Sequence, residues 1–152
     1  MMIYSQKEFD HTIHTGTGTT RDFIVSPSLK KLNVNTPSDV LVHIYAEDYC
    51  FLTIIGGSQV FLTCGIHTPV ELFDTTSVTS FICGEFTCHQ YSTAQLYGSS
   101  CANTYESSKA ILHSPHSEAV SYNSSKIFAL AGEVTSYHTS IVYAFNDSSV
   151  TV

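Results

Sequence analysis

Hydrophobic and polar residues alternate along most of the chain with a period of two. The alternation is clear in Ser58–Leu62, in Ser77–Phe81 and in Gly84–His89. A period of two places successive side chains on opposite faces of a β-strand, whereas a helix repeats about every 3.6 residues. We therefore expect about fourteen strands of four or five residues, joined by tight turns.

A second repeat of seven to nine residues lies over this alternation. Each unit begins with a Ser or Gly, carries a small or β-branched residue two positions later, and carries a ring or a large aliphatic residue three positions after that. The first column of the repeat is Ser92, Ser100, Ser108, Ser117, Ser125, Gly132, Ser140 and Ser149. The second column is Ala94, Ala102, Ala110, Ala119, Ile127, Val134 and Val142. The third column is Tyr97, Tyr105, His113, Tyr122, Leu130, Tyr137 and Phe145. Turn formers such as Asn123–Ser124 close each unit, so one unit is a short strand plus a turn.

This repetition predicts an all-β fold, a β-solenoid with about eight residues per strand–turn unit and a small N-terminal cap. Stacked coils place equivalent residues about 4.8 Å apart in identical surroundings, which favours the same residue at the same offset. An antiparallel sandwich or barrel, the alternative, does not require such repetition. The small second column predicts a narrow interior, either between two facing sheets with about sixteen residues per coil or between three with about twenty-four.

The unit Ser-x-(Ala/Val)-x-(small)-(Tyr/His) resembles the octapeptide repeats, close to Ser-Ala-Thr-Val-x-Ala-Tyr-Asp/Gly, of proteins from phages and gut bacteria. The resemblance covers residues from about 58 to 152. This chain often has Ser at the turn, where the commoner repeats have Asp or Gly. The resemblance implies a β-solenoid fold and a phage or mobile-element origin, and it assigns no residue roles.

The ends of the chain depart from the repeat. Residues 1–37 are expected to form a cap, in which Ser5–Glu8 fits a capping box opening a helix through about Ile13, followed by a flexible loop. Residues 38–152 are expected to form the solenoid repeat domain. The chain stops in mid-unit at Val152, and an open coil edge favours association, so we expect a homo-oligomer or an end-to-end contact.

Composition narrows the possible partners. The net charge is −7 with only six Lys and Arg residues, which disfavours direct contact with nucleic acid. No signal peptide and no apolar run of about 18 residues is present, so no membrane contact is expected. We expect a soluble protein of a bacterial cytoplasm, or of the virion if it is a phage structural protein. The five cysteines form no CxxC pair and are expected to be free, small core residues.

The rings of the third column are expected to point outward in one or more ladders along the solenoid. Cross-strand stacking that stabilises the sheet is one interpretation, and a platform for a ligand is the other. The candidate ligand-binding residues are Tyr97, Tyr105, His113, Tyr122 and Tyr137 of the ladder, with Arg21, His11 and His14 of the cap. The acidic residues look scattered rather than paired, and no catalytic, metal-binding or cofactor-binding motif is found.

The leading functional hypothesis is a non-enzymatic β-solenoid that serves as an interaction or structural module and associates with itself. A small-ligand protein that binds or sequesters a nucleotide or a sugar, for example a phage anti-defence protein, is the alternative. An acidic mimic of nucleic acid, suggested by the charge of −7, is the third.

Overall fold

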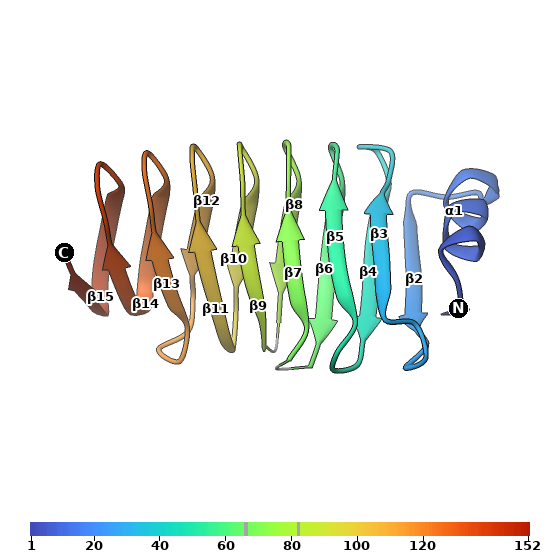
Figure 1. Cartoon of the computed structure of the whole chain (residues 1–152), viewed down its shortest axis with the longest axis horizontal. Helices are drawn as coiled ribbons and strands as arrows, with labels where there is room; N and C mark the ends of the chain where they lie inside the picture. The colour runs from blue at the N-terminus through green and yellow to red at the C-terminus, as the bar shows by residue number, and fades with distance from the viewer. Residues whose placement is uncertain (66, 82) are drawn as a thin grey trace.

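A computed structural model shows a β-solenoid, in which parallel strands stack in two columns around a narrow core (Figure 1). The structure describes residues 1–65, 67–81 and 83–152, without the side chain of Cys83. Its elements are β1 (Met2–Ile3), α1 (Gln6–Thr15), β2 (Thr20–Val25), β3 (Lys31–Asn35), β4 (Leu41–Ala46), β5 (Phe51–Ile55), β6 (Gln59–Cys64), β7 (Pro69–Leu72), β8 (Ser77–Ser80), β9 (Cys83–Cys88), β10 (Thr93–Leu96), β11 (Ser99–Thr104), β12 (Lys109–Leu112), β13 (Glu118–Ser121), β14 (Lys126–Ser136) and β15 (Ile141–Thr151).

Each coil contributes one strand to each of two facing columns. The even-numbered strands from β2 to β12 form one column, which we call the first sheet, and the odd-numbered strands from β3 to β13 form the second sheet. The long strand β14 joins the columns, since its first half pairs with β12 and its second half with β13. Ser77 pairs with Thr93 and Thr93 with Lys109, so the chain returns to the same column after two units of the repeat. The two-sheet coil is therefore confirmed over the three-faced alternative.

The small residues of the second column of the repeat fill the core. Ala94, Ala102 and Ala110 are at most 1% exposed. Larger residues such as Leu96 and Leu112 are completely buried two positions further along their strands. The alternation along each strand thus places one face in the narrow interior and the other outside, as the sequence predicts.

The stack begins earlier than the sequence indicates. Strand β2 already pairs in parallel with β4, and β3 pairs with β5, so residues from Thr20 onward belong to the stack rather than to a cap ending at residue 37. The first coil is long, because Thr20 pairs with Leu41, a wider separation along the chain than that between Ser77 and Thr93. Its extended turns hide the period of eight that marks the later coils.

The N-terminal helix covers the first coil. Ser5 caps α1 by accepting a hydrogen bond from the backbone N–H of Glu8, as the capping box predicts, and the helix continues to Thr15. Phe9 and Ile13 of α1 are buried against the core. Figure 1 shows the helix closing one end of the stack. Within the described ranges, no helix is long and apolar enough to cross a membrane.

The cysteines follow the prediction with one exception. Cys50 and Cys88 are buried free thiols, and Cys64 is buried as well. Cys101 is also a free thiol but is exposed, because it lies at an outward position of β11. The side chain of Cys83 lies outside the described part of the structure.

Candidate functional site

The recurring serine of the repeat is a buried bridge between coils. Ser108 accepts a hydrogen bond from the backbone N–H of Tyr105 at 3.0 Å, and its Oγ lies 2.9 Å from the carbonyl oxygen of Cys88 in the preceding coil. Ser125 repeats both contacts, with Tyr122 and Thr104. The serine therefore forms a hydrogen bond within its own turn and another to the preceding coil, a role that the sequence alone does not reveal.

Gly132 takes the place of the recurring serine in one unit of the repeat, where the fold leaves no room for a side chain. Its φ is +99°, and a Cβ atom at this residue would lie 2.4 Å from the carbonyl oxygen of Ser117. Both the backbone conformation and the close approach require glycine.

One ladder of rings follows the strands of the second sheet. It consists of Phe73, His89, Tyr105, Tyr122 and Tyr137, which we call the second-sheet ladder. Successive ring centroids lie 4.8 to 5.4 Å apart, and the interplanar angles do not exceed 12°. Each stacked pair contributes about 0.5–1.5 kcal/mol beyond its burial. The ladder therefore reinforces the contacts between coils.

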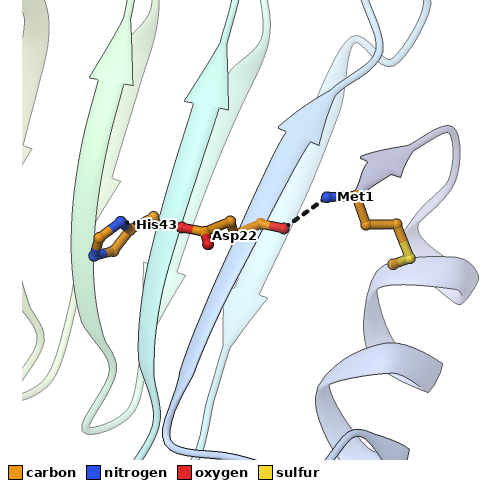
Figure 2. A network of polar contacts seen from close by, with 3 residues as sticks. All are labelled: Met1, Asp22 and His43. Carbon is orange, nitrogen blue, oxygen red and sulfur yellow. Dashed lines mark hydrogen bonds and ion pairs between the residues drawn. The ribbon is translucent and has the colours of Figure 1, made fainter.

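A further ladder lies on the first sheet. It consists of His43, Phe61, Phe81, Tyr97 and His113, which we call the first-sheet ladder. At its N-terminal end, Nδ1 of His43 lies 3.1 Å from Oδ1 of Asp22, whose backbone carbonyl accepts from the amino group of Met1 at 2.9 Å (Figure 2). Through Asp22, the first-sheet ladder thus links the amino terminus to the middle of the stack.

His113 ends this ladder as a neutral ring. Its centroid lies 4.0 Å from that of Tyr97, the planes are nearly parallel at 6°, and its buried Nε2 has no hydrogen-bond partner among the described residues. Burial lowers the pKa of His113, so the imidazole is uncharged near neutral pH. An uncharged ring can be buried against Tyr97 without the cost of desolvating a cation.

The candidate ligand residues fall into separate places. Figure 1 shows β3 and β5 of the second sheet pointing to one edge of the stack and β2, β4 and β6 of the first sheet pointing to the other. Because the third-column rings follow the ends of strands, Tyr97 and His113 lie at one edge, while Tyr105, Tyr122 and Tyr137 lie at the opposite edge. The expected outward ladders are confirmed, but they form two surfaces.

Arg21, one of the candidate ligand residues, closes the C-terminal end of α1. Its guanidinium donates hydrogen bonds to the carbonyl oxygens of Thr12, Ile13 and Gly16 at 2.5 to 2.6 Å. The last carbonyls of a helix have no partner within the helix and carry partial negative charge, so a cation there is stabilising. Strand β2, which carries Arg21, is separated from β10 by three strands, or about 19 Å along the stack.

The two candidate histidines of the helix remain at the surface. His11 and His14 are exposed on α1, at the N-terminal end of the stack. The third-column rings begin several coils further along the chain. The structure therefore does not bring the cap residues and the ladder into one site.

The carboxylates are less scattered than the sequence suggests. Glu85, Cys101 and Glu118 occupy one outward row of the second sheet, and Glu118 pairs in register with Glu133. The spacing between these partners differs from coil to coil, so the linear sequence does not display the row. Among the described residues, no group of three or more His, Cys, Asp or Glu side chains is placed to hold a metal ion.

The C-terminal coil leaves its core side open. Val134 is 2% exposed, whereas Val150, its partner in register on β15, is 40% exposed. Ala144 is likewise exposed, although its partner Ala129 is completely buried. Ala144 and Val150, which hold core-facing positions, therefore form part of a surface in β15, whereas Val142 still packs against the core.

No family model, curated protein or solved structure matches this chain.

Proposed function

We propose that the protein is a non-enzymatic β-solenoid interaction module that associates with a second copy of itself through its C-terminal coil. The observation that carries the proposal is the difference between Val134 and Val150, which hold the same register position but are 2% and 40% exposed. Covering such a coil stabilises a solenoid, because each coil buries its inward side chains only against its neighbours.

The two ends of the stack differ in how well their last strands are covered, and this difference indicates which surface of a second copy contacts β15. At the N-terminal end, the side chain of Gln6 both donates to the carbonyl oxygen of Asn33 and accepts from its N–H, each at 2.8 Å. Strand β1 pairs with β2 on the same coil. Both strands of the first coil are thus covered, whereas β15 pairs with β14 alone among the described strands. The open end therefore fits another open end, which gives a closed two-fold dimer.

The surface of β15 suits this contact. Asp147 is the single charged residue between Ile141 and Thr151, so little charge opposes the approach of a second copy. Unpaired backbone groups of an edge strand form hydrogen bonds with another strand, and charged side chains are the usual protection against this. The strand lacks that protection.

The ring ladders support a framework role. Stacked rings cover one another's faces, as the interplanar angles of at most 12° in the second-sheet ladder indicate. Their edges and polar tips then remain for contact with solvent or a partner. The resemblance to octapeptide repeats supports a phage origin for this module, as part of an assembly protein.

The dimer is tested by measuring the mass of the particle over a range of concentrations by light scattering after size exclusion. We expect two chains per particle for the wild type, and one chain for Val150→Lys, because the substitution places a charge in the contact. Ser149→Lys is the matched control, since its side chain lies on the opposite face of the same strand and the dimer is expected to persist. A mass of one chain for the wild type at every concentration would overturn the proposal.

A further inference from the structure

A cleft lies beside the first coils, away from the third-column rings of both ladders. It has a volume of about 740 Å³ and is formed by strands β2, β4 and β6 together with the turns that follow them. Clefts of about 300–1,000 Å³ are typical of small-molecule sites. The residues that line it come from strands and turns of different coils, so the linear sequence does not group them.

Side chains of three adjacent strands form the floor of the cleft. Ile24 pairs in register with Tyr45, and Tyr45 with Thr63. All three line the cleft, and Ile24 and Tyr45 are 46% and 45% exposed. The floor therefore offers an apolar surface and an aromatic ring with a polar tip.

The turn after β4 forms a wall of the cleft and is held in place by the next coil. Asp48 accepts a hydrogen bond from the backbone N–H of His67 at 3.2 Å, and Tyr49 stacks on the ring of His67 at 5.5 Å. A Cβ atom at Gly65 would lie 1.7 Å from Oδ1 and 2.9 Å from the backbone N of Asp48, so any other residue at this position would displace Asp48. The wall is thus fixed without a ligand.

Tyr49 has the features of a binding residue. Its φ is +69°, which is rare for a bulky side chain and costs about 1–3 kcal/mol. The ring is nevertheless 66% exposed, with His67 stacked against it. Among the described residues, six other non-glycine residues also have a positive φ, so this conformation is a feature of the turns. The exposed ring beside the cleft is what marks Tyr49 as a candidate binding residue.

The charges of the cleft disfavour an anionic ligand. Glu47 and Asp48 line it together with one cation, Lys30. The two carboxylates repel a phosphate or a carboxylate group, and Lys30 offsets only one of their charges. Ionised carboxylates only accept hydrogen bonds and an ammonium only donates them, so a group rich in hydroxyls can satisfy all three.

We propose that this cleft binds a neutral saccharide. The apolar face of a sugar ring would pack on Tyr45 and Tyr49, while its hydroxyl groups donate to Glu47 and accept from Lys30. This inference is independent of self-association, because the cleft lies at the opposite end of the stack from β15.

The proposal is tested by titrating the full chain with neutral trisaccharides built from glucose, galactose, mannose or N-acetylglucosamine, using calorimetry and saturation-transfer NMR. We expect at least one of them to bind, and Tyr49→Asn to weaken that binding at least tenfold. Asn removes the ring but tolerates a positive φ. Tyr45→Thr, which replaces the ring by another residue with high β-propensity, should weaken it as well.

Tyr91→Asn is the matched control. Tyr91 is an equally exposed turn tyrosine, at 71%, in a later coil that does not line the cleft, and its loss should leave affinity unchanged. The proposal fails if none of the trisaccharides binds, or if Tyr49→Asn binds as well as the wild type. It also fails if only the anion AMP or the cation spermidine binds.

Discussion

A single buried hydroxyl determines much of the stability of each turn. The Oγ of Ser108 is completely buried and lies within hydrogen-bond distance of the carbonyl oxygens of Tyr105 and Cys88, at 2.6 and 2.9 Å. It also accepts from the N–H of Tyr105. Without this oxygen, the N–H of Tyr105 keeps its bond to the carbonyl oxygen of Cys88, but the turn loses the hydroxyl that bridges it to the preceding coil.

We therefore expect Ser108→Ala to lower the free energy of unfolding by about 0.5–1.5 kcal/mol, the net contribution of a typical hydrogen bond. The preceding residue provides the control, because Ser107 is exposed in the same turn, and Ser107→Ala should change stability by less than about 0.5 kcal/mol. Urea denaturation followed by circular dichroism measures both. Equal effects of the two substitutions would contradict the bridging role of Ser108.

Cys101 is exposed but is a poor nucleophile. Partial burial and the carboxylates of Glu118 and Glu85 raise the pKa of its thiol. The raised pKa lowers the fraction of thiolate at a given pH, and the thiolate is the species that reacts. Cys88 is protected further, because complete burial raises its pKa to about 12.

Alkylation with iodoacetamide at pH 8 should therefore modify Cys101 slowly and Cys88 only after unfolding, as measured by peptide mass spectrometry. Glu118→Gln removes one negative charge next to the thiol, lowers its pKa and should accelerate modification of Cys101 several-fold. Glu106→Gln, in a turn outside this row, serves as the control. Rates at Cys101 that are the same in both variants would exclude the effect of Glu118.

At the scale of elements, the helix α1 depends on a residue of β2 for its position. Arg21 satisfies three carbonyl oxygens at the end of the helix, and Phe9 and Ile13 anchor the opposite side in the core. A helix of 10 residues is marginal by itself in water. Its stability thus comes from these tertiary contacts.

Arg21→Ala should destabilise the cap by about 2 kcal/mol, because hydrogen bonds to a charged group contribute about 1.5–3 kcal/mol each and this side chain is partly solvated. Amide hydrogen exchange should accelerate in residues 6–15 and remain slow in the central strands. His14→Ala, a surface substitution on the same helix, is the control and should leave exchange unchanged. Uniform loss of protection along the chain would argue against a local capping role.

At the scale of the whole molecule, the sequence predicts the regular part of the fold and little else. The columns that begin with Ser92 and Ala94 stack at a near-constant step, so their spacing is visible in the linear sequence. The first coils are hidden, because the longer step from Thr20 to its partner Leu41 breaks the period.

The arrangement of the candidate residues is harder to predict from the sequence, for a geometric reason. The alternation indicates that the rings point outward, but a linear repeat does not show that alternate units lie at opposite edges, which separates Tyr97 from Tyr105. The contact of Arg21 with α1 depends on how the helix packs. The cleft brings Lys30 and Tyr49 together from turns of different coils, whose lengths follow no rule in the sequence.

The short step between paired strands, such as that from Thr93 to Lys109, also bears on how the chain reaches its native state. Each new strand closes a loop of only two repeat units against the strand already in place, so its partner is always near in sequence. Such a chain can fold by adding one coil at a time to those already formed. Its relative contact order of about 0.1 resembles that of a helical bundle rather than that of an all-β sandwich. An all-parallel sheet, which is normally slow to assemble, is here built almost entirely from short-range steps.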